Sequence, residues 1–495
     1  MRFLSAVGTL ASLPFAADRP FAGPRDSIMS KRTTASEVGH LRALGGNVRH
    51  VRRNSLLGRV SGAMAGLANG FMHPSLIVAG FIFAITESYF LVALIAIIDK
   101  LGVLAPQIAA SSLMEHHSRR RPFFVGLTVA RVAAFGALVL CIWLLGRSVT
   151  TTGLFAFFSA YAVLSIVTGA THVVFIDMTG RYIPTHRVGA FFGTRSFLGG
   201  GLAVLAGLLV IQPILGGRLG NLAPPDRYLL VAVIGLVLVA ADMGTFSLCR
   251  EAPGHRARRR TSVGESLRRG WVWLRKNRDY RCYFWMRVGF RLFFLGLAFF
   301  VPYGKEQLGA DATAEEVALL GGVLVATFRL AGVLSVTVLG RLADRLGSRA
   351  VMIWGGVFML AGPLLTMAAT LMPTAFQWAV PALSRPVDLP LVAYLLGLAC
   401  LGVGLNGVIV GGNRFVVTTA PPARRASYMG FVNTATCPLA LLPLLGAYFA
   451  EQFGIGVVYW LVAAGGLISL VAAASMSDAA ARPAEGPARQ PDEPS

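Results

Sequence analysis

The stretch "GRLADRLGSR", residues 340–349, decides the fold, because an earlier part of the chain repeats its pattern. That earlier part is "SSLMEHHSRR", residues 111–120. When the two are overlaid, Glu115 matches Asp344, and Arg120 matches Arg349. An acidic residue followed by arginines at the same place in two parts of one chain indicates internal duplication.

A second pair of stretches supports the duplication. "PTHRVGAFFG", which begins at Pro184, aligns with "PPARRASYMG", which begins at Pro421. This alignment places Arg187 on Arg424. Two parallel repeats in a chain of helices are typical of a duplicated transporter.

The long apolar stretches between these motifs predict a membrane protein. Of the 495 residues, 55% are hydrophobic and 14% are charged, whereas roughly a quarter of the residues of a soluble domain are charged. A helix that crosses the bilayer needs about 20 apolar residues. We therefore expect an all-α polytopic protein whose twelve transmembrane helices form two pseudo-symmetric halves of six. The expected spans are 57–83, 90–114, 123–146, 152–176, 189–212, 228–249, 282–304, 315–339, 350–372, 389–415, 427–450 and 455–475.

The first two spans require a choice. The run 76–98 is the most apolar, but it leaves only 101–114 before a basic stretch, which is too short to cross. Division at "TESY", residues 86–89, gives two segments of sufficient length. We adopt this division, although it makes the first helix polar.

The distribution of basic residues predicts the orientation. The net charge is +22, and 41 of the 45 basic residues are arginine. The five loops on one side hold 21 Lys and Arg, whereas the six loops on the other side hold five. The positive-inside rule then places both termini in the cytoplasm of a protein of the cell (inner) membrane. The basic surface faces anionic lipid of the inner leaflet, which argues against nucleic acid as a partner.

Five parts are expected along the chain: a basic cytoplasmic tail (1–56), a six-helix half (57–249), a basic linker (250–281), a second six-helix half (282–475) and a disordered cytoplasmic tail (476–495). The first residues, "MRFLSAVGTLASLPFAAD", also fit a secretory signal. A true start at Met29 is a further alternative, so the presence of residues 1–28 in the mature protein stays open.

The linker contains a predicted amphipathic helix. Ser262 and Glu265 form a capping-box pattern. Leu267, Trp271 and Leu274 then share one face, with basic residues around them. We expect this helix to lie on the inner membrane surface, where it tethers the halves.

At these motifs the chain resembles the major facilitator superfamily over roughly residues 57–475. Gly340, Asp344 and the basic residues after them fit the loop motif of that family. The earlier copy departs from it at Ser111 and Ser118, which stand in place of glycine. The Gly-Pro pair of the family's antiporters is absent from "FLGGGLAVLAGLL", which makes drug antiport a less favoured function.

The resemblance implies a secondary active transporter of a small molecule that works by alternating access without a cofactor. An enzyme is not expected, because the chain has no HExxH, GxSxG or P-loop motif. Two histidines within spans are too few for a metal centre. The alternatives are an uncoupled facilitator and a transporter-like receptor or scaffold.

The loop motifs are interpreted as a conformational latch. A carboxylate and arginines at helix ends can bond a neighbouring helix terminus in one conformation and release it in another. The alternative is that these arginines only orient the protein. The predicted latch residues are Glu115, Arg119, Arg120, Gly340, Asp344, Arg345, Gly347 and Arg349.

Ionisable side chains inside spans are candidates for a substrate site, because each costs about 2.5–3.5 kcal/mol to insert. Arg287 and Arg291 share a face of the seventh span, where Arg291 lies deeper and Arg287 could snorkel to the surface. Two fixed positive charges favour an organic anion. In the family, helices one, four, seven and ten line the cavity. The candidates are Asn69, His73, Lys100, Thr168, His172, Arg291, Arg329 and Asn406, with helix–helix hydrogen bonding as the alternative for each.

Asp99 is the predicted coupling residue, because a buried carboxylate can carry a proton or cation. It is adjacent to Lys100 but about 100° around the helix, so the two are not expected to face each other. The alternative is a fixed ion pair with a basic residue of another helix. Arg131, Arg195, Asp242 and Arg414 lie towards the cytoplasmic side and are expected to support closure there.

Overall fold

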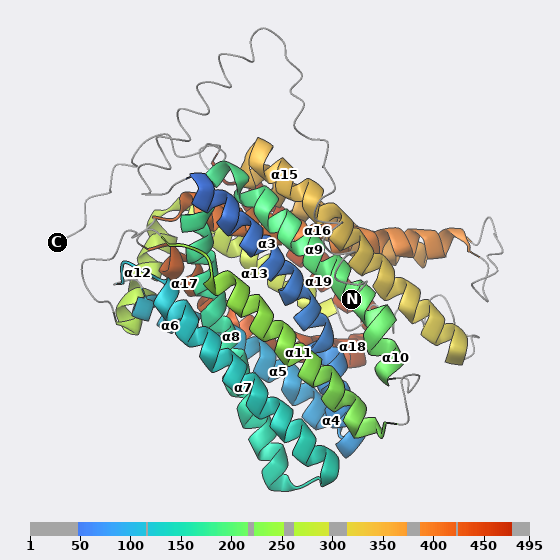
Figure 1. Ribbon diagram of the computed structural model, residues 1–495. Coiled ribbons are helices and arrows are strands. Elements are labelled where there is room, and N and C mark those ends of the chain that lie inside the picture. Colours follow the sequence, from blue (N-terminus) through green and yellow to red (C-terminus); the bar gives the residue numbers. More distant parts are fainter. Residues whose placement is uncertain are drawn as a thin grey trace. The chain divides into compact units, whose positions relative to one another are not determined.

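The computed structural model describes residues 48–114, 117–215, 222–251, 262–296, 314–373, 387–421 and 424–477. Contacts divide the chain into two units, Met1–Val48 and Arg49–Ser495, and the helices below belong to the second unit apart from Val48 itself. Every regular element among the described residues is a helix (Figure 1), which confirms the expected all-α architecture. Glu115, most of the N-terminal tail and most of the C-terminal tail lie outside the described residues.

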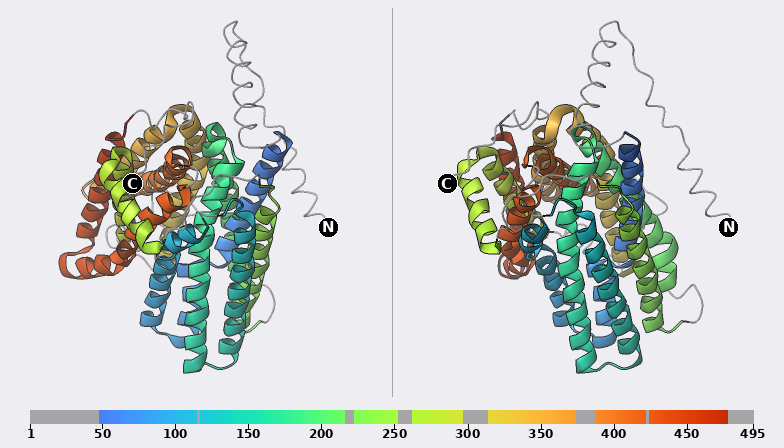
Figure 2. Two further views of the ribbon diagram at one scale, coloured as in Figure 1. Left: turned by 90° about the vertical axis from the view of Figure 1, so that its left-hand side faces the viewer. Right: turned by 60° about the vertical axis from the view of Figure 1, so that its left-hand side comes forward.

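The N-terminal half is the name used here for α3 to α11. Figure 2 shows two of its helices, α7 and α8, as a long pair that lies side by side. The half consists of α3 (Val48–Phe71), the π-helix η1 (Pro74–Val78), α4 (Ala79–Thr86), α5 (Tyr89–Leu104), α6 (Gln107–Met114), α7 (Arg121–Arg147), α8 (Thr151–Tyr182), the 3-10 turn η2 (Thr185–Arg187), α9 (Val188–Ala206), the π-helix η3 (Gly207–Ile211), α10 (Gln212–Leu215) and α11 (Pro224–Ser247).

The first two membrane segments meet at Glu87, where the chain turns. Glu87 adopts a left-handed conformation with a φ of 53°. The Ser88 side chain then accepts a hydrogen bond from the N–H of Leu91 and caps α5. The division at "TESY" is therefore confirmed. The first segment is itself interrupted between Phe71 and Pro74, since proline lacks the N–H that would continue α3.

The C-terminal half is the name used here for α13 to α19, and the linker helix α12 precedes it. The bounds are α12 (Val263–Lys276), α13 (Arg278–Gly296), α15 (Ala314–Ala369), α16 (Leu389–Thr419), α17 (Arg425–Ala435), the 3-10 helix η5 (Cys437–Leu441), α18 (Leu442–Phe453) and α19 (Ile455–Ala474).

The helix α15 holds two membrane segments. It has 56 residues, and a straight helix of that length would measure about 84 Å, far more than the hydrocarbon core of about 30 Å. Gly347 breaks it with φ 89° and ψ 169°. This φ favours glycine, so the final glycine of "GRLADRLG" permits the turn between the eighth and ninth spans.

All twelve expected spans overlap helices of the structure, and the end of the seventh, 297–304, lies outside the described residues. In the described residues, 8 helices are long and apolar enough to cross a membrane, or up to 9 if the bent pair of α17 and η5–α18 is one span. One of the 8, in α15, contains the two segments just described. The two remaining spans fall short of the criterion, because α3 is polar and interrupted and α13 carries arginines.

Glycines allow the helices to cross closely. A Cβ atom at Gly66 of α3 would lie 2.1 Å from the Cα atom of Gly199 in α9, so the two backbones touch. A Cβ atom at Gly200 would lie 2.6 Å from the Val333 side chain of α15, whereas Gly201 faces open space. Two of the three consecutive glycines of α9 therefore permit close packing. Figure 1 shows α9 alongside both α3 and α15.

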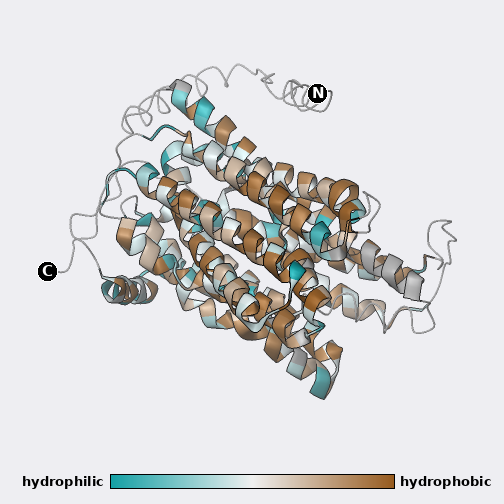
Figure 3. Ribbon diagram, turned by 60° about the horizontal axis from the view of Figure 1, so that its bottom comes forward, coloured by the Kyte–Doolittle hydropathy of each residue, from teal (hydrophilic) through white to brown (hydrophobic). Residues whose placement is uncertain are grey.

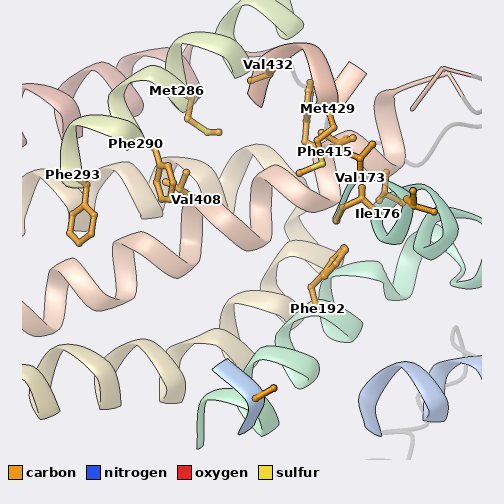
Figure 4. Packing of buried hydrophobic residues seen from close by; sticks show 14 of the residues in the cluster. Val173, Ile176, Phe192, Met286, Phe290, Phe293, Val408, Phe415, Met429 and Val432 are labelled. Carbon is orange, nitrogen blue, oxygen red and sulfur yellow. The ribbon is translucent and has the colours of Figure 1, made fainter. Parts of the chain in front are cut away.

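The apolar core extends across both halves. Figure 4 shows Met286, Phe290 and Phe293 of α13 on the side of that helix that faces Val408 and Phe415 of α16. Residues of α8, α9 and α17 continue the same cluster. Figure 3 shows hydrophobic residues along most of the length of the helices. This is the pattern of spans that contact lipid on one side and protein on the other.

The linker helix α12 is only in part as expected. The Ser262 side chain accepts from the N–H of Glu265, as the capping pattern predicts. Leu274 is buried against the protein, whereas Leu267 and Trp271 are exposed. Leu274 is buried together with Ser266 and Gly270 of the same helix. The exposed part stays a predicted membrane surface.

Candidate functional site

The Asp344 carboxylate contacts the start of α9 at the basic end of the bundle. The basic end is defined by the loops after α6, α8 and α16 and is the end predicted to be cytoplasmic. The N–H groups of Gly189 and Ala190 donate to the two carboxylate oxygens at 2.8 and 2.6 Å. Arg414 Nε donates to the same carboxylate at 3.2 Å. Free N–H groups and the helix dipole favour an anion at this position. The contact joins the two halves.

Gly340 lies at the same crossing, one turn before Asp344. A Cβ atom at Gly340 would lie 2.5 Å from the Gly189 carbonyl oxygen and 3.0 Å from Gly193 Cα. The absence of a side chain therefore lets α15 approach α9 until the carboxylate reaches the N–H groups.

The other arginines of the C-terminal loop motif are placed differently. Arg349 donates to the carbonyl oxygen of Ala474 at 2.8 Å, within its own half. Arg345 is exposed, and so is Arg119 of the N-terminal copy. The structure brings together Gly340 and Asp344 of the predicted set, while Arg345 and Arg119 lie at the surface.

Arg120 anchors the loop of the N-terminal half. It is fully buried, and its Nε donates to Asp177 of α8 at 3.0 Å. The guanidinium also donates to the carbonyl oxygens of Met114 and His117. Arg181 donates to the same Asp177 carboxylate at 3.1 Å. All these bonds stay inside one half.

Glu251 is a residue that the sequence analysis missed. Its carboxylate accepts from the N–H groups of Arg120 and Arg121 at 2.8 Å and so caps the start of α7. Arg181 Nη1 lies 3.5 Å from it. Glu251 follows α11 by only a few residues, but the sequence held no signal that the linker folds back to α7.

A second contact between the halves lies on the seam of α6 and α17. Asn433 donates to the side chain of Gln107 at 2.7 Å. Arg287 donates to the Asn433 oxygen at 3.2 Å and is buried. The alternative that Arg287 snorkels is therefore wrong, because this amide and the ring of Phe290, 4.9 Å away, hold it inside.

Basic side chains from both halves lie around His172 of α8. The charges of Arg131, Arg195, Arg287 and Arg291 all act on His172 of α8. Arg291 is 8% exposed, and its Nε has no hydrogen-bond partner among the described residues. A buried guanidinium without a partner is costly.

One carboxylate lies near this group. Asp242 accepts from the Ser61 hydroxyl at 2.5 Å and lies 3.8 Å from Arg195. Arg195 also donates to the carbonyl oxygen of Gly58 at 2.7 Å. Asp242 and Arg195 thus bind each other and α3 inside the N-terminal half, which leaves Arg287 and Arg291 without a carboxylate partner in the described part of the chain.

A third contact between the halves lies farther from the basic end. Nη2 of Arg329 in α15 is 3.3 Å from Nε2 of His73. Nearby, Lys100 Nζ lies 2.7 Å from the Asp99 carboxylate. The expectation that Asp99 and Lys100 do not face each other is wrong, because the long lysine side chain reaches back to its neighbour.

Within the described part of the chain, no hydrogen bond to another helix is formed by Thr168 or Asn406, although the Asn406 amide packs against Gly332 of α15. The Thr168 hydroxyl donates to Leu164, and Asn406 donates to Gly402, each within its own helix. Asn69 is exposed. The described residues contain no group of three His, Cys, Asp or Glu that could hold a metal ion.

The structure also has a groove of about 470 Å³ on the outside of α13 and α19. Trp285 and Val471, which line it, are exposed. It contains none of the predicted site residues.

The family model described as Major Facilitator Superfamily matches residues 56–439 and 300–494. The chain belongs to the major facilitator superfamily. Two proteins with similar sequences are the multi-drug resistance efflux pump PmrA of Streptococcus pneumoniae serotype 4 and the multidrug resistance protein MdtG of Dickeya zeae. They are 26% identical over 164 residues and 32% identical over 177 residues. The matches cover 33% and 34% of this chain, and 36% and 38% of the relatives.

Solved structures of major facilitator superfamily transporters share the fold. A bacterial homologue of the iron transporter ferroportin in the outward-facing state aligns with a TM-score of 0.66 and 15% identity, over 86% of this chain and 99% of that chain. FucP in the outward conformation aligns with a TM-score of 0.63 and 13% identity, over 85% and 97%. At this identity the likeness concerns the fold alone.

Proposed function

We propose that this member of the superfamily is a secondary active transporter that carries a small organic anion by alternating access. The observation that carries the proposal is the buried pair Arg287 and Arg291 on α13. Arg291 has no hydrogen-bond partner for its Nε among the described residues, and Arg287 bonds only an amide oxygen. An anion between the halves would supply the missing negative charge and bidentate hydrogen bonds.

The positive charge of this region also favours an anionic over a cationic substrate. The two curated relatives carry names of multidrug pumps, and each match covers about a third of the relative. A cationic drug beside Arg287 and Arg291, which have no carboxylate partner among the described residues, would incur like-charge repulsion. The two arginines therefore favour an anionic compound.

Coupling to protons is part of the proposal. Asp99 is the candidate carrier, and its carboxylate lies 2.7 Å from the Lys100 ammonium. The uncoupled facilitator is the alternative and differs in one respect: it would carry substrate only down its gradient. The lipid bilayer with its anionic inner leaflet is the proposed setting, with the basic end towards the cytoplasm.

The test is a ligand screen by thermal stabilisation of the purified protein with anionic, neutral and cationic metabolites. A ligand that binds only the folded state adds about 2.7 kcal/mol at a hundredfold excess over Kd. We expect anionic ligands to stabilise the parent and to lose their effect in Arg291→Ala. The matched control is Arg281→Ala, which removes an exposed arginine of the same helix. Stabilisation by cations, or anion binding that survives Arg291→Ala, would refute the anion site.

A further inference from the structure

The contact between His73 and Arg329 joins the two halves at a break in the first span. His73 stands between the end of α3 and Pro74, the first residue of η1. Its carbonyl oxygen accepts from the N–H groups of both Ile77 and Val78, at 2.9 and 3.4 Å. A span interrupted by a π-helix is a place where helix direction can change at low cost.

The chemistry of the two side chains determines the protonation state of His73. A guanidinium has only donors and stays protonated in proteins. The 3.3 Å contact from Arg329 Nη2 therefore needs a lone pair on His73 Nε2. The imidazole must be neutral, with its proton on Nδ1, because a doubly protonated ring would turn an N–H towards another N–H.

Three charged groups lie near His73. The charged groups that act on it are Arg329 of α15 and Lys100 and Asp99 of α5. Asp99 is bonded to Lys100 at 2.7 Å. His73 Nδ1 is buried and has no partner within the described part of the chain. A proton added to His73 therefore places a cation against Arg329 with no carboxylate bonded to either ring nitrogen.

We propose that protonation of His73 breaks its contact with Arg329 and separates the first and eighth spans at this level, so that His73 is a proton-sensing residue of the transport cycle. This inference rests on the proposed alternating-access function and names a second titrating group beside Asp99. The break at Pro74 supplies the freedom to move, and the guanidinium supplies the repulsion. Neutral His73 holds the spans together, and acid releases them.

The experiment measures the separation of the halves directly. Spin labels at Thr151 and Leu371, on a background without the five native cysteines, report the distance between the ends of α8 and α15 that lie far from the basic end. Both positions are exposed. The protein in lipid nanodiscs is measured from about pH 8.5 to about pH 4, a range that extends well below the ordinary histidine pKa of about 6.5 because the neighbouring Arg329 resists a second cation.

We expect a longer-distance population to grow as the pH falls, by at most about tenfold per pH unit for one linked proton. In His73→Gln the amide oxygen can still accept from Arg329 but cannot titrate, so the short distance should persist at all pH values. His73→Lys should give the long distance at all pH values. His186→Gln, a control at the basic end, should respond to pH as the parent does.

A parent distribution that does not change with pH, or an acid shift that persists in His73→Gln, would overturn the proposal. The measurement uses no substrate, so it stands apart from the ligand screen. A pH response without anion binding would keep the proton sensor and discard the anion site. Anion binding without a pH response would keep the anion site and discard the proton sensor.

Discussion

Asp177 in α8 and Arg414 in α16 occupy corresponding places in the two halves and carry opposite charges. The alignment that places Pro184 on Pro421 also places Asp177 on Arg414. Each forms an ion pair with the loop motif of its own half, Asp177 with Arg120 at 3.0 Å and Arg414 with Asp344 at 3.2 Å. The two aligned positions thus exchange the sign of their charge, while their loop partners differ in place, since Arg120 aligns with Arg349 and Asp344 with Glu115.

This exchange gives the two pairs different roles. The loop acid of the C-terminal half has oxygens free to accept from α9 of the other half. The loop base of the N-terminal half donates to carbonyl oxygens of its own loop. A bond between halves can be made and broken in a transport cycle, whereas a bond within a half serves stability.

The first prediction concerns Asp344→Asn. The substitution removes the charge that two helix N–H groups bond, and hydrogen bonds to charged groups contribute about 1.5–3 kcal/mol each. We expect the basic end to open more often, with a population shift of roughly tenfold or more. Spin labels at Arg119 and Ser475 measure the opening. Arg345→Gln, an exposed residue of the same motif, is the control, and an equal shift in both variants would argue against the latch.

The second prediction compares the two ion pairs in stability. The side chains of Arg120 and Asp177 are each 1% exposed, whereas those of Arg414 and Asp344 are 4% and 11% exposed. Removal of one partner of a fully buried pair costs about 3–5 kcal/mol. We expect Asp177→Asn to lower the midpoint of thermal unfolding more than Asp344→Asn does. If Asp344→Asn proves the more destabilising, the division between stability and switching is wrong.

The third prediction concerns two glycine contacts. Gly66 meets Gly199 inside the N-terminal half, and Gly340 meets Gly189 across the halves. Overpacking costs about 1–3 kcal/mol or more. Gly66→Val should therefore lower folding stability, while Gly340→Val should leave each half folded and open the basic end. Thermal unfolding and the label pair Arg119 and Ser475 separate the two effects. A Gly340→Val protein that unfolds like Gly66→Val would contradict this.

The fourth prediction concerns Asp99. Asp99→Asn removes the proposed proton carrier, so uptake against a gradient should disappear while exchange down a gradient continues. Lys100→Gln leaves the carboxylate in place and removes only its 2.7 Å partner, so uphill uptake should persist with a changed pH profile. Proteoliposomes with a ligand from the screen provide the measurement. Uphill uptake that is unaffected in Asp99→Asn would end its role in coupling.

Local spacing was sufficient to predict most of the fold. The length of the apolar segments predicted the helices, and the polar stretch "TESY" predicted the turn at Glu87 and Ser88. The repeat predicted that Asp344 stands at a helix end. These features depend on residues close in the chain, for which helix geometry and capping give firm rules.

The pairings across the bundle could not be predicted in the same way. The contacts of His73 with Arg329, and of Asn433 with Gln107, join residues far apart in the sequence. They depend on the rotation of each helix about its axis and on the distance between neighbouring helices. Both are set by the close packing of side chains in the folded protein. The ion pair between Asp99 and Lys100 was not predicted for another reason. The angle between two residues around a helix does not fix the position of the ammonium group at the end of a flexible lysine side chain.

The position of α12 has a consequence for how the basic end opens. Ser266 of this helix bonds Ser112 of the N-terminal half at 2.9 Å, and its Gly270 lies under Phe431 of the C-terminal half. Asn277 alone separates α12 from α13, so the helix must travel with the C-terminal half. Opening of the basic end must therefore break the bond between Ser112 and Ser266, which contributes about 1 kcal/mol, in addition to the bonds between α6 and α17.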